Sequence, residues 1–147
     1  MNYYDEIKHK LIDNETTKRV KDYSKNKSDL DTYYYVGKML SEAGKHYGEG
    51  IIKEYSSKLT IDLNKKYNVT TLKRIRQFFW KIEKGATMSH QLTWSHYVDL
   101  LSIKNINIVN YYIVLSIKNN FTIRELRERI LGREYKFVNN GGLNELL

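Results

Sequence analysis

The sequence predicts an all-α fold, a compact bundle of six to eight helices that contains a helix-turn-helix-like unit. Apolar residues recur at intervals of three and four along most of the 147-residue chain, as they do on the buried face of a helix. The chain contains no proline, the strongest helix breaker, so long uninterrupted helices are permitted. Capping signals precede several apolar stripes, and the length suits one domain with its own core.

The first half of the chain contains three predicted helices. The first begins near Tyr4, and the polar residues 14–27 after it form either a second helix or a solvated connection. Ser28 has the spacing of a capping residue for the next helix, which Gly44 ends because glycine tolerates the left-handed conformation of a helix stop. A long helix over residues 47–63 follows.

The central predicted helix is basic on its outer faces. It follows a turn at residues 67–69, is capped by Thr70 or Thr71, and stops at Gly85. Its buried stripe consists of four apolar side chains at helical spacing, namely Leu72, Ile75, Phe79 and Ile82.

Three shorter helices are predicted after this one. Thr93 caps the first of them. Residues 106–117 are rich in β-branched side chains, which favours a strand, but their spacing of three and four favours a helix. Residues 122–125 form a capping box for the last helix, which ends before Gly132.

The composition excludes several classes of protein. The absence of cysteine excludes a disulfide framework and a thiolate metal site, and it is typical of a reducing cytoplasm. No apolar run approaches the ~18 residues of a membrane helix, and the N-terminus lacks the order of a signal peptide. We expect a cytoplasmic protein without membrane contact, with a single helical domain over residues 1–132 and a flexible C-terminal tail over residues 133–147.

The net charge of +8 is unevenly distributed, with an excess between Lys65 and Lys84 and another over residues 124–136. A localised positive field favours encounters with nucleic acid or an acidic protein surface, although an ordinary solvated helix face has the same appearance. Gln77 is placed to read a base edge, and Trp80 falls among the cations, away from the apolar stripe. The predicted binding residues are Lys65, Lys66, Lys73, Arg74, Arg76, Gln77, Trp80, Lys81 and Lys84.

Several motifs occur in a fixed order along residues 33–136. Their sequences are YVGK from Tyr35, YGEGII from Tyr47, YSSKLT from Tyr55, LKRIRQFF from Leu72, SHQLTWSHY from Ser89, the pair Tyr111-Tyr112 and TIRELR from Thr122. The set resembles the N-terminal domain of the YhcG-type PDDEXK nuclease family. The chain departs from that pattern at Phe79, where the family has tyrosine, in a shorter loop over residues 43–47, and in ending where the nuclease domain would begin. The resemblance implies a helical part that recognises DNA and stands apart from the catalytic domain.

No catalytic group is predicted, so we expect no enzyme activity, no cofactor and no metal. Glu134 and Lys136 have the Glu-x-Lys spacing of a nuclease site but lack a partnered aspartate on a strand. His90 and His96 lie six residues apart, whereas two metal ligands on one helix face lie four apart. We expect His96 to stabilise a turn through a hydrogen bond.

The sequence therefore predicts a non-catalytic binding module whose basic surface contacts nucleic acid, most plausibly DNA. The alternative is a stand-alone inhibitor or regulator that binds another nuclease, of the anti-CRISPR or anti-restriction type found in phages and mobile elements. A third interpretation is that the chain is a piece of a longer nuclease. A homodimer is compatible with the aromatic-rich amphipathic helices, although nothing in the sequence specifies one.

Overall fold

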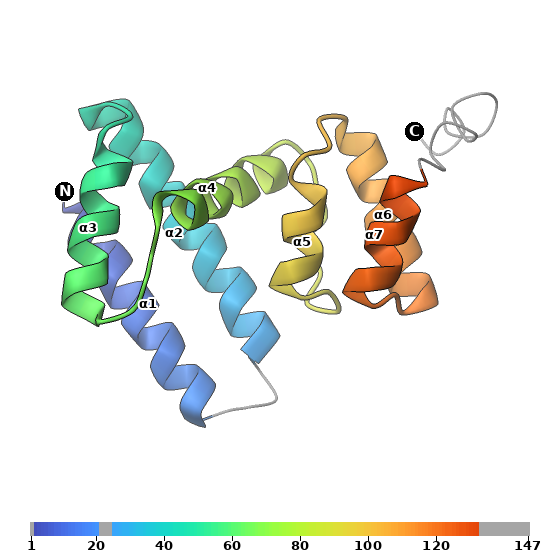
Figure 1. Cartoon of the computed structure of the whole chain (residues 1–147), viewed down its shortest axis with the longest axis horizontal. Coiled ribbons are helices and arrows are strands. Elements are labelled where there is room, and N and C mark those ends of the chain that lie inside the picture. The colour runs from blue at the N-terminus through green and yellow to red at the C-terminus, as the bar shows by residue number, and fades with distance from the viewer. Residues whose placement is uncertain (1, 21–24, 133–147) are drawn as a thin grey trace.

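The computed structural model describes residues 2–20 and 25–132, and these residues form seven helices and no strand (Figure 1). The helices are α1 (Tyr3–Val20), α2 (Lys25–Tyr47), α3 (Ile51–Leu63), α4 (Val69–Glu83), α5 (Trp94–Leu100), α6 (Ile106–Asn119) and α7 (Ile123–Leu131). The predicted all-α class is confirmed, and α6 is a helix, as its spacing indicates. The predicted C-terminal tail, with Glu134 and Lys136, lies outside the described residues.

Two groups of buried apolar side chains make up the core. One lies among α1, α2, α3 and the first part of α4, and the other among α5, α6, α7, the second part of α4 and the first part of α2, where Leu30 is buried. Leu72 and Ile75 of α4 belong to the first group, and Phe78 belongs to the second. Figure 1 shows α4 extending from the side of α1 to α3 toward α5. The basic helix α4 and the long helix α2 therefore each contribute buried side chains to both groups.

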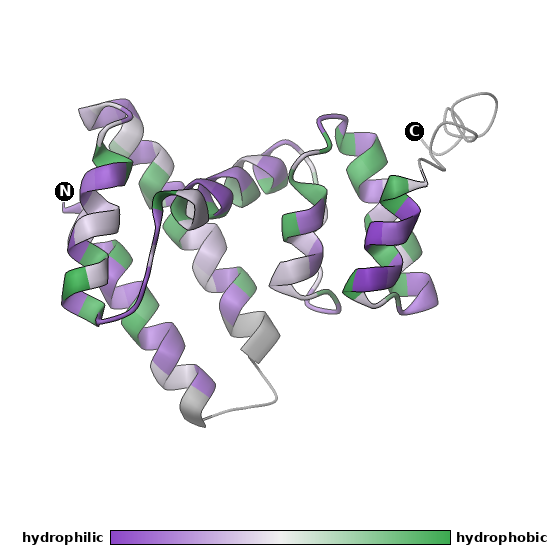
Figure 2. Cartoon of the chain, in the orientation of Figure 1, coloured by the Kyte–Doolittle hydropathy of each residue, from purple (hydrophilic) through white to green (hydrophobic). Residues whose placement is uncertain are grey.

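The apolar content differs among the last helices. Hydrophobic residues run along α6, whereas the visible side of α7 is mostly hydrophilic (Figure 2). Val109, Tyr112 and Ile113 of α6 are buried, and Leu126 of α7 is buried against the same group. Residues 106–117 thus form a helix although they are rich in β-branched side chains. Their spacing of three and four places the apolar side chains on one face of that helix, where they join the core.

The helices α2 and α4 approach each other closely at Gly37. A Cβ atom on Gly37 would lie 2.5 Å from the carbonyl oxygen of Ile75 and 2.7 Å from the Cβ of Phe79. A Cβ atom does not fit at such distances. The two helices can therefore lie this close together only because residue 37 is a glycine.

Three of the predicted helix boundaries are confirmed. The Thr122 hydroxyl accepts a hydrogen bond from the Glu125 backbone N–H, and Thr93 caps α5 in the same way. In a capping box a side chain inside the helix also accepts a hydrogen bond from the backbone N–H of the capping residue. In α7 that side chain is Glu125, and in α5 it is the imidazole of His96. Gly85 follows α4 with φ of 113°, a left-handed conformation that favours glycine.

Other predicted boundaries in the first half are wrong. Ser28 does not cap α2, because the helix begins at Lys25. Gly44 does not end it, since α2 continues to Tyr47 and the left-handed stop is Gly48, with φ of 91°. Consequently the next helix begins at Ile51 and not at residue 47. The burial of Ala43 and its neighbours on α2 stabilises the helix by more than the ~1 kcal/mol that an internal glycine costs.

The start and the buried arc of α4 also differ from the prediction. Asn68 is the cap, and its side chain accepts a hydrogen bond of 2.8 Å from the backbone N–H of Thr71, which lies inside the helix. Phe78 is fully buried, whereas Phe79 is only partly buried. The buried arc is wider than one stripe because α4 packs on α2 along one side and on α5 along another.

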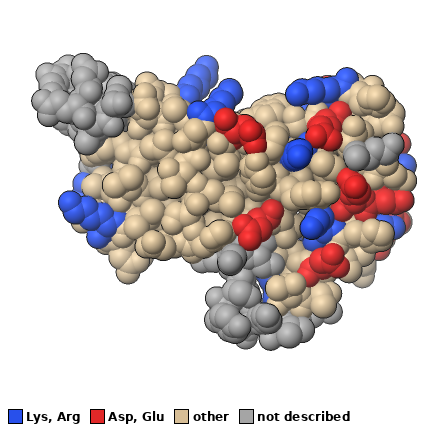
Figure 3. Space-filling model, turned by 180° about the vertical axis from the view of Figure 1, so that it is seen from behind, with Lys and Arg blue, Asp and Glu red and all other residues tan. Residues whose placement is uncertain are grey.

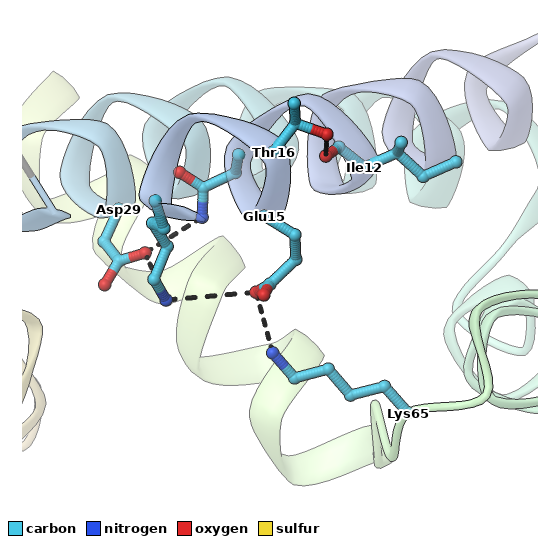
Figure 4. A network of polar contacts seen from close by, with 7 residues as sticks. Ile12, Glu15, Thr16, Asp29 and Lys65 are labelled. Carbon is cyan, nitrogen blue, oxygen red and sulfur yellow. Dashed lines mark hydrogen bonds and ion pairs between the residues drawn. The ribbon is translucent and has the colours of Figure 1, made fainter. Parts of the chain in front are cut away.

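The polar residues after Leu11 are part of α1, which runs without interruption to Val20. Asn14 is buried and donates a hydrogen bond of 2.9 Å to Asp29 of α2, which also pairs with Lys18 at 3.2 Å. Glu15 pairs with Lys65, 2.8 Å away in the connection between α3 and α4 (Figure 4). This polar network explains why a weakly amphipathic segment remains helical, since its partners come from α2 and from the connection between α3 and α4.

Candidate basic interface

The outer side of α4 holds five of the predicted binding residues. At helical spacing these positions fall on one side of α4, opposite the arc that packs on α2 and α5. Trp80 is 39% exposed, and the other four side chains are exposed. We call this set the α4 basic face, and it consists of Lys73, Arg74, Gln77, Trp80 and Lys84.

Arg76 is not exposed, contrary to the prediction. Its side chain is 9% exposed, and its two terminal nitrogens donate to the Glu49 carboxylate at 2.8 and 2.6 Å. These hydrogen bonds lower the pKa of Glu49, and the positive charges of Arg76 and Lys73 lower it further. Arg76 is buried because the α2–α3 connection folds over it and supplies a carboxylate for its charge. It therefore orders the structure beneath the α4 basic face and is not part of that face.

Trp80 is held in a fixed orientation. Its indole Nε1–H donates to the hydroxyl of Ser41 on α2 at 2.9 Å. The guanidinium of Arg76 lies over the ring, 4.7 Å from its centroid, which is cation–π geometry. The ring therefore keeps a substantial exposed area while its polar atom is satisfied within the protein.

Lys81 lies on the same side of α4 as the basic face but is only partly exposed, whereas the prediction treated it as an exposed cation. Its ammonium donates to the carbonyl oxygen of Ile103, in the connection between α5 and α6. Burial lowers the pKa of Lys81, and the charge of Lys84 lowers it further. The protonated form of Lys81 is therefore less favoured than that of a lysine in water.

Two hollows of about 350 Å³ each lie between α4 and the residues after α5. They share Gln77, Leu101 and Ser102. The first is lined by Gln77, Trp80, Lys81, Lys84, Leu101, Ser102 and Lys104, and the second by Arg74, Gln77, Val98, Asp99, Leu101 and Ser102. The α4 basic face is therefore one wall of a groove whose other wall comes from α5 and the connection after it.

The two predicted cations before α4 differ in their surroundings. Lys65 is paired with Glu15, so part of its charge is neutralised. Lys66 is exposed and has no ion pair with any residue that the structure describes. Lys104 is not among the predicted residues because it lies twenty residues beyond Lys84, outside any apolar stripe, and only the packing of α5 brings it to the groove.

Figure 3 shows the back of the molecule. On this face acidic and basic side chains alternate over the part that contains α1 to α3, and the other part carries few charged groups. The described residues on this face thus form no continuous basic area. The excess of positive charge expected from the sequence is therefore not found on this face of the molecule.

The histidines have structural surroundings. His96 is buried, accepts a hydrogen bond at Nδ1 from the backbone N–H of Thr93 at 3.1 Å, and contacts the carbonyl oxygen of Phe121 through Nε2 at 2.9 Å. This contact assigns the ring proton to Nε2. Tyr97 lies beside it, and its hydroxyl accepts from the backbone N–H of Ser89 and donates to the carbonyl of Thr87, each at 2.7 Å. The Ser89–Tyr97 motif therefore orders the connection between α4 and α5.

Among the described residues, no three or more His, Cys, Asp or Glu side chains are grouped so that they could hold a metal ion. None of the described helices has both the length and the apolar character that crossing a bilayer requires.

Comparison with known proteins identifies the family. The family model described as the DUF1016 N-terminal domain matches residues 6–136, which include all the ordered motifs from Tyr35 to Arg127. No curated protein and no solved structure matches the chain. The match includes the Glu49 and Arg76 motifs that the ion pair joins. The chain belongs to the DUF1016 N-terminal domain family, which is the N-terminal domain of YhcG-type proteins.

Proposed function

We propose that this chain is a non-catalytic binding module that contacts nucleic acid through the α4 basic face. One observation carries the proposal. Lys73 and Arg74 on α4 and Lys84, which follows its last residue, are exposed, and none of them forms an ion pair with a carboxylate among the described residues. Cations that are not neutralised within the protein attract the phosphate backbone and release its counterions on binding.

The arrangement of α3 and α4 supports a helix-turn-helix-like mode of binding. Residues 64–68 join the two helices, and α4, the second of the pair, carries the exposed cations. In DNA-binding proteins of this kind the second helix enters the major groove and its N-terminal residues contact the bases. Lys73 and Arg74 lie in that part of α4 and are suited to phosphate contacts, and Gln77 is suited to an adenine edge. The resemblance to a nuclease family supports DNA as the nucleic acid.

The experiment that tests this proposal is a salt titration with a fluorescently labelled DNA duplex, followed by anisotropy. If three cations neutralise phosphates, log K falls by about 2.7 for each tenfold rise in salt, so affinity weakens roughly 40-fold between 50 and 200 mM. The Lys73→Gln/Arg74→Gln variant is expected to reduce this slope by about 2.

The matched control removes the same two charges elsewhere. Lys53 on α3 and Lys118 on α6 are exposed, and the Lys53→Gln/Lys118→Gln variant is expected to leave the slope nearly unchanged. Equal effects of the two double variants, or binding that does not depend on salt, would count against the proposal. A complex with a protein that survives nuclease treatment of the lysate would instead support the inhibitor interpretation.

A further inference from the structure

The hollow beside Trp80 combines an aromatic ring with three ammonium groups. Its volume of about 350 Å³ lies at the lower end of the range for ligand pockets, about 300–1,000 Å³. Lys81, Lys84 and Lys104 line it, and no acidic side chain does. We call it the Trp80 hollow.

The indole of Trp80 is available to a partner on the side of this hollow. Arg76 covers one part of the ring, yet Arg76 is not among the residues that line the hollow. The hollow therefore meets a part of the indole that Arg76 leaves uncovered. Because the hydrogen bond to Ser41 fixes the ring, a flat group that stacks here pays little entropy to order it.

The charge of the hollow favours an anion. The Lys81 ammonium is partly buried, its donor bond goes to a neutral backbone carbonyl, and it has no carboxylate partner among the described residues. Burial and the charge of Lys84 disfavour the protonated form of Lys81, and a bound phosphate would stabilise that form. The apolar Leu101 lies in the same hollow, so its surface suits a ligand with one flat apolar part and one anionic part.

We propose that the Trp80 hollow takes one unpaired nucleotide, with its base against the indole of Trp80 and its phosphate beside Lys81, Lys84 and Lys104. This inference rests on the proposed function and specifies the form of nucleic acid that is bound. A base within a duplex is paired and stacked, and it does not reach such a hollow unless it is extruded. Unpaired strands offer free bases, and aromatic stacking on them is tolerant of sequence. The module therefore prefers single-stranded nucleic acid to an intact duplex.

The test compares an oligothymidine of twelve nucleotides with a duplex of the same length, using anisotropy for affinity and intrinsic fluorescence for Trp80. The single strand is expected to bind about tenfold more tightly, since stacking of a base contributes about 1–3 kcal/mol. It is also expected to quench tryptophan fluorescence. Trp80→Leu should weaken single-strand binding more than duplex binding and so lose most of this preference, whereas Trp80→Phe should keep most of the preference and lose the quenching.

A second variant avoids any dependence on the folding of Trp80→Leu. Lys104→Gln changes an exposed side chain outside the core, and it is expected to weaken single-strand binding several-fold. Duplex binding that equals single-strand binding, with no quenching, would overturn this inference and leave the proposed function intact. Failure of both nucleic acids to bind would overturn the two together.

Discussion

The guanidinium of Arg76 and the carboxylate of Glu49 form a two-pronged ion pair that joins α4 to the connection between α2 and α3. The pair links two motifs that lie 27 residues apart in the sequence. It also places Arg76 against Trp80, 4.7 Å from the centre of the indole. Arg76 thus stabilises the fold, whereas Lys73 and Arg74, which lie close to it in the sequence, remain exposed.

The first prediction concerns this ion pair. Glu49→Gln is expected to lower the free energy of unfolding by about 1 kcal/mol, because the poorly exposed Arg76 loses a charged acceptor. The value is modest because the Glu49 side chain is 62% exposed and water replaces part of the interaction. Urea denaturation measures it. Glu54→Gln is the control, since its exposed pair with Lys58 is expected to contribute less than about 0.5 kcal/mol.

The same pair predicts a dependence of stability on pH. Hydrogen bonds from Arg76 hold the pKa of Glu49 below its ordinary value of 4.5. The folded protein therefore binds that proton less readily than the unfolded chain, so the stabilisation is fully present above pH 4.5 and is lost as the pH falls through the folded pKa. The stability difference between the wild type and Glu49→Gln should accordingly shrink below pH 4.5. A difference that stays constant down to pH 3 would contradict this assignment.

The crossing of α2 and α4 predicts that Gly37→Ala is strongly destabilising. The new methyl group would meet the Ile75 carbonyl at 2.5 Å, so the helices must separate, at a cost of about 1–3 kcal/mol or more. Gly50→Ala is the matched control, because Gly50 has φ of −59° and no atom within 4 Å of the added Cβ. That variant is expected to change stability by less than about 1 kcal/mol. Similar melting temperatures for both variants would show that the crossing is looser than described.

The last prediction concerns the buried imidazole. His96→Ala removes a hydrogen bond to the Phe121 carbonyl and another from the Thr93 backbone, and it is expected to cost about 2–3 kcal/mol. His90→Ala should cost less than about 1 kcal/mol, since the pair of His90 with Asp31 is largely exposed. Thermal unfolding followed by circular dichroism measures both. Addition of Zn²⁺ should leave the wild-type melting temperature unchanged, and a rise would indicate that a metal site had been overlooked.

Local sequence patterns were sufficient to predict the all-α fold class of this protein and several of its helix boundaries. The spacing of apolar residues determines the helical class, even where β-branched residues favour a strand, as in α6; the polar end of α1 is the exception. The capping boxes at Thr93 and Thr122 and the stop at Gly85 follow from short-range hydrogen bonds and from backbone conformation. These features depend on residues within one turn of each other, so a sequence contains all the information that they need.

The remaining features needed the tertiary structure. Gly44 stays helical because Ala43 and its neighbours are buried, and the sequence does not show which neighbour covers them. Arg76 is buried because Glu49 reaches it from another segment, and Lys81 is drawn to the carbonyl of Ile103. Each outcome depends on a contact between segments far apart along the chain. The sequence alone determined where cations and apolar residues recur, whereas only the packing of α2, α4 and α5 decided which of those cations stay exposed.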